Sequence, residues 1–245
     1  MITKWKVSNF KSIREETELD FGPLTIFAGA NSSGKSSFIQ SILLVAQTLS
    51  HKVGSRSVVL NGAMTSLGQF DDLKSNGSES EQIIIKYTCR PIKGQKNAYT
   101  ESEYLSRNSI IYGSIFGRIN EIDCEFSFDA DLHSLERDLF QIQPRLLSTQ
   151  LSCIYRDEEN IDQRSKIFIH HSSKALLETE SIEGIDDISS LAYLVELDDD
   201  GLSEIREEYR SANPVGCEFN HFLPAQIIYE IDTVKEDANM ITIAL

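Results

Sequence analysis

The chain has 245 residues, with 23 basic and 38 acidic side chains and a formal net charge of −15. This length is enough for one large domain or two small ones, and the 40% hydrophobic content is typical of a globular protein. The charge excludes a uniformly basic nucleic-acid-binding protein but leaves a local basic patch open. The sequence contains no run of eighteen apolar residues, so no transmembrane helix is predicted. The four cysteines are scattered along the chain, which predicts reduced thiols and a cytoplasmic location.

The first elements predicted along the chain are three extended segments. Residues 2–7 alternate in the manner of a strand, and a second extended piece ending near Leu19 follows the turn NFKSI at 9–13. Gly22 and Pro23 mark another turn. The run LTIFA at 24–28 is continuously apolar and rich in β-forming residues, which is typical of a strand buried on both faces.

A phosphate-binding motif follows this run directly. Residues 29–36 read GANSSGKS and fill every fixed position of the pattern G-x-x-x-x-G-K-[ST]. A chance match is expected in roughly 1% of chains of this length, and a plain Gly/Ser-rich turn before a helix is the weaker interpretation. The helix is predicted over residues 35–49, and because it is apolar nearly all round, we expect it to be buried between layers.

The chemistry of this motif predicts a site for ATP with Mg²⁺. Gly29 and Gly34 allow backbone conformations in which successive N–H groups point at an anion, and the helix N-terminus adds partial positive charge. Lys35 is expected to reach the β- and γ-phosphates, and it is one of our two catalytic candidates. We expect the Ser36 hydroxyl to complete the Mg²⁺ shell and Ser37 to donate to the α-phosphate. The other loop residues expected to contact the nucleotide are Asn31, Ser32 and Ser33.

The opening of the chain resembles the N-terminal half of ABC-type ATPases of the SMC, RecF and OLD group. The residues that carry the resemblance are NFKSI at 9–13, the apolar run after Gly22-Pro23, and GANSSGKSS leading into an apolar helix. Within that group the chain looks most like the AAA-type ATPases of Septu-type and retron-associated antiphage systems. Two further stretches add to the likeness: VVLNGAMTSLGQFDDL at 58–73 and NHFLPAQI at 220–227.

The resemblance implies an α/β fold, a P-loop NTPase of the ABC/SMC-head type with a large antiparallel β-subdomain. It also implies two more contacts with the phosphates, because the basic residue of the NFKS turn lies against them in SMC-like ATPases; here that residue is Lys11, with Ser12 beside it. The glutamine that ligates Mg²⁺ and orients the attacking water has a candidate in Gln69, our second catalytic candidate. An ordinary polar loop glutamine is an equally good interpretation of Gln69.

The sequence lacks two motifs that such an ATPase needs, the Walker B motif and the signature motif. The stretches 191–200 and 227–232 imitate the Walker B motif only weakly, since Glu196 interrupts the first apolar run, and we assign neither a catalytic role. We therefore expect residues 1–75 to form the P-loop core and residues 76–245 a mainly β subdomain and the start of an insertion. The half with the signature and Walker B motifs would lie outside this chain, which would then bind ATP without hydrolysing it. A short, degenerate ATP-binding protein is the alternative.

The rest of the sequence is predicted to be mostly β. The expected strands are 83–88, 110–115, 119–128, 151–155, 166–170 and 191–197, with a strand pair over 217–230. A short helix or a loop is predicted over 134–147, and a helix over 203–209. The most basic local stretch contains Lys93, Lys96 and Arg107, and we interpret it as a solvated hairpin in preference to a nucleic-acid contact.

At the level of function, the resemblance implies an ATP-binding and ATP-hydrolysing subunit of a bacterial antiphage defence complex, in which ATP-driven dimerisation controls a partner nuclease. The implied partners are further copies of the chain, in a homodimer or a higher homo-oligomer, and an HNH-type nuclease. Retron-type systems add a reverse transcriptase and its DNA–RNA hybrid. No membrane association is expected. The alternatives are an ATP-dependent scaffold that does not hydrolyse ATP, and a RecF-like DNA-repair ATPase.

Overall fold

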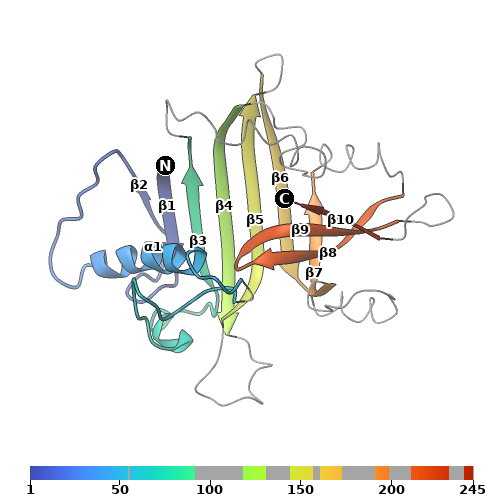
Figure 1. Cartoon of the computed structure of the whole chain (residues 1–245). Helices are drawn as coiled ribbons and strands as arrows, with labels where there is room; N and C mark the ends of the chain where they lie inside the picture. Colours follow the sequence, from blue (N-terminus) through green and yellow to red (C-terminus); the bar gives the residue numbers. More distant parts are fainter. Residues whose placement is uncertain are drawn as a thin grey trace.

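The computed structural model describes residues 1–54, 56–91, 118–130, 144–156, 161–172, 191–198, 211–231 and 240–244. These residues form two antiparallel sheets, the helix α1 (Lys35–Leu49) and the 3-10 helix η1 (Phe70–Asp72) (Figure 1). The larger sheet has the order β2 (Thr17–Asp20), β1 (Ile2–Ser8), β3 (Ile83–Cys89), β4 (Arg118–Ala130), β5 (Pro144–Arg156), β6 (Asp162–His171) and β7 (Tyr193–Leu197). The smaller sheet has the order β10 (Met240–Ala244), β9 (Leu223–Glu230) and β8 (Asn213–Asn220). The large antiparallel sheet and the mixed α/β composition that we expected are confirmed.

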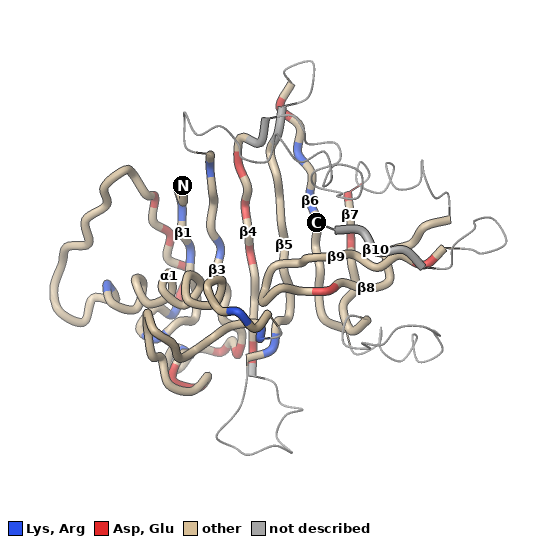
Figure 2. The backbone as a smooth tube through the Cα atoms, viewed as in Figure 1, with Lys and Arg blue, Asp and Glu red and all other residues tan. Residues whose placement is uncertain are grey.

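The larger sheet has one apolar and one charged face, because side chains alternate along each strand. On the apolar face, Val7 pairs with Ile85 and Ile85 with Phe126, and all three are buried. On the opposite face, Lys86 pairs with Glu125, and their side chains form an ion pair of 3.4 Å. Figure 2 shows charged residues spaced along β1, β3 and β4. The apolar face therefore decides where the rest of the chain packs.

Helix α1 lies on the apolar face of the larger sheet, and a hydrogen bond from β1 helps to hold it in position. The indole Nε1–H of Trp5, which is 1% exposed, donates to the Ser41 hydroxyl over 3.0 Å. The helix spans residues 35–49 as predicted. Its expected burial on all sides is wrong, since Ile39 and Leu49 are 39% and 44% exposed. The sheet covers one side of the helix, and no other sheet of the described residues covers the second side (Figure 1).

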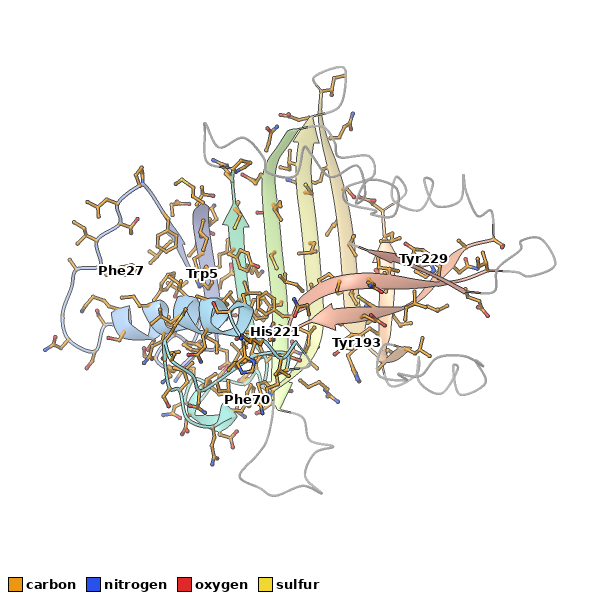
Figure 3. The ribbon with its side chains drawn as sticks, viewed as in Figure 1. Trp5, Phe27, Phe70, Tyr193, His221 and Tyr229 are labelled. Carbon is orange, nitrogen blue, oxygen red and sulfur yellow. The ribbon has the colours of Figure 1, made fainter. Side chains whose placement is uncertain are left out.

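The strand predicted at 24–28 is also wrong. These residues adopt no strand, and the side chains of Leu24 and Ile26 are 80% and 78% exposed. Phe27 is partly buried, with its ring 5.8 Å from that of Phe38 on α1 (Figure 3). A β-prone run becomes a strand only where a neighbour supplies its hydrogen bonds. Both edges of β1 are already paired, with β2 and β3, and residues 24–28 do not pair with the outer edge of β2 either.

The hairpin of β8 and β9 forms a second layer over the larger sheet (Figure 1). At its turn, the fully buried Phe222 stacks on Phe126 with 4.0 Å between the ring centroids, and the Thr149 hydroxyl donates to the Phe222 carbonyl over 2.7 Å. The neighbouring His221 contacts the carbonyl oxygens of His51 and Arg56 through its two ring nitrogens (Figure 3). The hairpin predicted near residue 220 is thus confirmed, and it is attached both to the sheet and to the chain after α1.

Most other predicted strands are confirmed. Segments 83–88, 119–128, 151–155, 166–170 and 191–197 lie in or overlap β3, β4, β5, β6 and β7. The predictions for 110–115 and 203–209, residues 134–143 of the segment 134–147, and the basic residues Lys93, Lys96 and Arg107 lie outside the described residues. The prediction of a helix or loop is wrong for residues 144–147, which begin strand β5 because they pair with β4. The boundary proposed at residue 75 falls between η1 and β3, and the pairing of β3 with β1 joins strands from both sides of it. Within the described part of the chain, no helix is long and apolar enough to cross a membrane.

The burial of the cysteines predicts their reactivity. None of the four forms a disulfide, and burial raises the pKa of Cys124 to about 12, that of Cys153 to about 11, and that of Cys217 further still. Cys89 is only half-buried, although burial raises its pKa as well. Because the thiolate is the reactive form, we expect Cys89 to react first with Ellman's reagent at pH 8 in the native protein, and all four thiols to react in guanidinium. Four fast thiols in the native protein would contradict this packing.

Candidate nucleotide-binding site

The phosphate-binding motif forms an exposed loop that leads into α1. Gly29 has a φ of 145° and Gly34 a φ of 86°, which are conformations that a Cβ disfavours. Gly34 is the N-cap of α1 in the left-handed conformation. A Cβ at Gly34 would lie in ordinary contact with the Ser12 hydroxyl, at 3.5 Å, so the positive φ and not the space is what disfavours a side chain there. The two glycines that the motif fixes are therefore required by the backbone of this loop.

The start of α1 offers unneutralised positive potential. Its N-cap makes no side-chain hydrogen bond, and its first turn contains no acidic residue. The first N–H groups of a helix have no partner within the helix, so an uncapped start is suited to bind an anion. Ser36, in the first turn, is exposed, as are Asn31, Ser32 and Ser33 in the loop. The phosphate groups of a nucleotide fit this donor set.

Lys35 lies across the loop and not out in solvent. Its ammonium group donates to the carbonyl oxygens of Gly29, over 2.8 Å, and Ala30, and it lies 3.2 Å from the Ser33 hydroxyl. All these acceptors belong to the exposed loop, so the ammonium group stays accessible to a ligand entering it. Phosphate oxygens are stronger acceptors than these neutral oxygens. An incoming phosphate would thus find the cation already placed at the loop.

The turn that contains Lys11 and Ser12 meets the beginning of α1. The hydroxyls of Ser12 and Ser37 are 2.8 Å apart, and Lys11 has a φ of 52° within the tight turn between Phe10 and Ile13. Residues that are 25 positions apart are thereby brought to one side of the loop. The contact places this turn beside the motif, and a contact of Lys11 with phosphate stays a prediction.

Asn9 is a structural residue of this turn that our sequence reasoning missed. It is 3% exposed, has a φ of 55°, and donates through Nδ2 to the carbonyls of Ser80 and Gln82. Its Oδ1 accepts from the N–H of Ser75. An asparagine directly before a tight turn is a known turn signal, which was the available clue. Asn9 fixes the turn of Lys11 against the strand connection that follows η1.

Gln69 lies at the start of η1 and is exposed. Its N–H donates to the Asp72 carboxylate over 2.8 Å, and the η1 turn is joined to the Lys11 turn because the Lys11 N–H donates to the Leu73 carbonyl. In the described structure no hydrogen bond joins Gln69 to Ser36 or Lys35. The segment of Gln69 is therefore connected to the P-loop through the Lys11 turn, while its role in Mg²⁺ binding stays a prediction.

The weak imitations of a Walker B motif lie elsewhere in the fold. Glu196 is on β7, and the Asp198 carboxylate next to it accepts from the N–H of Lys166 on β6. β7 is the opposite edge of the larger sheet from β2, with β1 next to β2 (Figure 1). Glu230 ends β9 in the smaller sheet. Asp199, Asp200 and Asp232 of the two stretches lie outside the described residues, and the absence of a catalytic role for these acids stays a prediction.

Together, the loop, its positive-φ glycines, the uncapped helix and Lys35 define a P-loop nucleotide-binding protein. Comparison with protein families agrees, since the AAA ATPase domain family matches residues 1–213. The chain belongs to this AAA ATPase domain family, whose members typically use ATP and Mg²⁺, and the match indicates an ATP-binding, ATP-hydrolysing protein. Comparisons with curated proteins and with solved structures gave no match.

Proposed function

We propose that the chain is the ATPase subunit of a bacterial antiphage defence complex of the Septu or retron type, in which ATP-driven dimerisation controls a partner nuclease. The observation that carries the ATP-binding part is the uncapped start of α1 behind a loop with Lys35 lying across it. Lys35 would bind the β- and γ-phosphates, Ser36 the Mg²⁺ ion and Ser37 the α-phosphate. Lys11, Ser12 and Gln69 would approach the same nucleotide from the neighbouring turns.

The exposure of the site supports dimerisation. Asn31, Ser33 and Ser36 are open to solvent, so the described part of the chain leaves one side of a bound nucleotide uncovered. Beside the loop, Leu24 and Ile26 form an exposed apolar pair, and such surfaces mark protein contacts. A second copy that covers the loop would bury the nucleotide between two protomers, and hydrolysis would release it.

The negative charge of the chain supports a partner nuclease that makes the contacts with nucleic acid. With a net charge of −15, the chain as a whole repels nucleic acid. The outward face of the larger sheet also balances its lysines with acids, as in the 2.7 Å ion pair between Lys4 and Glu18, where the Lys4 hydrogen bond lowers the pKa of Glu18 to about 2. Nucleic-acid contacts would therefore come from an HNH-type nuclease or, in a retron-type complex, from a reverse transcriptase with its DNA–RNA hybrid.

A second candidate function is a scaffold that binds ATP without hydrolysing it. The observation that favours it is the position of the acids. Among the described residues, no carboxylate forms a hydrogen bond or ion pair with the loop, and Glu196 lies on the far strand β7, with Asp198 just after its end. Hydrolysis needs a group that orients or activates water. The ATPase and the scaffold would both bind ATP, but only the ATPase would hydrolyse it.

Sedimentation velocity and co-purification test this proposal. We expect the purified chain to sediment as a dimer with ATP and Mg²⁺ and as a monomer with ADP. When it is expressed with its neighbouring genes, a nuclease should co-purify with it. Phosphate release from ATP would separate the ATPase from the scaffold. A chain that binds ATP but stays monomeric and captures no nuclease would refute the defence assignment while leaving the nucleotide site intact.

A further inference from the structure

Gln47, on the helix that begins at the P-loop, has a buried amide that forms three hydrogen bonds. It is 5% exposed. Its Nε2 donates to the Val59 carbonyl over 2.8 Å, and its Oε1 accepts from the N–H groups of Met64 and Thr65 over 3.1 and 2.9 Å. A long polar side chain is rarely buried unless its polar atoms are hydrogen-bonded. Gln47 therefore holds the returning segment 59–65 against α1.

The neighbouring residues leave this arrangement little freedom. Thr48 Oγ1 accepts from the Val59 N–H over 2.9 Å and donates to the Leu44 carbonyl. Gly62 lies directly against the amide, since a Cβ there would come within 2.6 Å of Gln47 Cδ. Both hydrogen-bonding groups of Val59 are thus bound to side chains of α1. The segment is fixed to the helix in a single register.

Asn61 forms hydrogen bonds with the residues that come directly before Gln69. Its Oδ1 accepts from the Ser66 hydroxyl at 2.9 Å and from the N–H groups of Leu67 and Gly68 at 3.0 Å, and its Nδ2 donates to the Gly68 carbonyl at 2.8 Å. Gly68 has a φ of 84°, and a Cβ there would lie 2.3 Å from the Asp72 carboxylate that accepts the Gln69 N–H. The residue after Gly68 is Gln69, so its backbone position follows from Asn61.

We propose that Gln47 and Asn61 are positioning residues that set Gln69 relative to the phosphate-binding loop, with α1 as the rigid link. This inference rests on the proposed nucleotide site and on Gln69 as its Mg²⁺ ligand. Ser36 and Gln47 lie on one helix, about 17 Å apart along its axis. The helix thus presents the loop at one end and the support of Gln69 at the other. A shift of the 59–68 segment would move Gln69 without altering the loop.

The test measures ATP affinity by calorimetry, once with Mg²⁺ and once with EDTA. Supporting residues around a metal contribute about 10–100-fold to metal affinity. We therefore expect Gln47→Leu to reduce the Mg²⁺-dependent gain in ATP affinity by about tenfold or more, leaving the affinity in EDTA unchanged. Asn61→Ala should do the same. Because Asn61 is exposed, we expect Asn61→Ala to fold, so it tests the proposal even if Gln47→Leu does not fold. Asn61→Asp retains the three accepted hydrogen bonds but sets a carboxylate oxygen against the Gly68 carbonyl, so it should restore part of the gain that Asn61→Ala loses.

Two controls separate a positioning role from a general loss of structure. Gln40 is half-buried on the same helix and makes no hydrogen bond to the 59–68 segment, so Gln40→Leu should retain the full Mg²⁺-dependent gain. Gln69→Ala should lose the gain, and adding Gln47→Leu to it should cause no further loss, because the two changes act through one residue.

The outcomes are distinct. Three results would each overturn the positioning role. They are a wild-type Mg²⁺-dependent gain in ATP affinity in both Gln47→Leu and Asn61→Ala, a smaller gain in the double variant than in Gln69→Ala, and a full gain in Gln69→Ala. In all three cases ATP binding in EDTA would still support the nucleotide site. If the wild-type chain binds no ATP at all, the proposed function itself fails, and the inference fails with it.

Discussion

Replacing Lys35 with alanine is expected to abolish ATP binding. The ammonium group lies at the mouth of the loop on the carbonyl oxygens of Gly29 and Ala30, where a triphosphate would take it as its main cation. Since these contacts are exposed, the variant should keep the melting temperature of the wild type. Titration calorimetry with ATP and Mg²⁺ measures the effect.

The matched control for this variant is Lys52→Ala. Lys52 is an exposed lysine that follows the same helix, at its other end. It carries the same charge, so the control separates a specific phosphate contact from a change in net charge. We expect Lys52→Ala to bind ATP with wild-type affinity. Tight ATP binding in Lys35→Ala would remove the basis for the nucleotide site.

Replacing Phe222 with alanine is expected to be strongly destabilising. The ring is fully buried and stacks on Phe126, and it is the aromatic contact between the β8–β9 hairpin and β4. Truncation of a buried phenylalanine costs about 3–5 kcal/mol, because it removes buried apolar surface and leaves a cavity. Urea unfolding followed by circular dichroism measures the free energy of unfolding.

Leu194→Ala on β7 provides the comparison, since Leu194 is 39% exposed. An exposed position of this kind should change the free energy of unfolding by no more than about 0.5 kcal/mol. Equal stabilities for the Phe222 and Leu194 variants would mean that the hairpin does not pack on the larger sheet as described. A selective loss at Phe222 would locate the contact between the two layers.

The phosphate-binding loop and α1 were predictable because their signals are local. Gly34 needs a positive φ that few other residues tolerate, and an apolar run begins directly after it. The hairpin around Phe222 was predictable for the same reason, as two β-prone runs flank a turn. Signals of this kind depend on the residues themselves and their immediate neighbours.

The fate of residues 24–28 was not predictable from their own composition. Ile26 and Phe27 have strong strand preference, yet no strand of the larger sheet pairs with the run, and it forms no strand. The roles of Asn9, Gln47 and Asn61 were also missed, because a polar side chain reveals its partners only once distant segments meet. Gln47 bonds to residues up to 18 positions away, and Asn9 to residues more than 65 positions away.

By itself the sequence determined the class of this protein. The spacing of two glycines, a lysine and a serine before an apolar helix specifies a P-loop, since a phosphate site needs those residue types at those positions. The tertiary structure decided what surrounds that loop: which face of α1 is covered, why 24–28 stays outside the sheet, and how Gln69 is held. Those features depend on hydrogen bonds and packing between residues far apart in the chain, which no local pattern encodes.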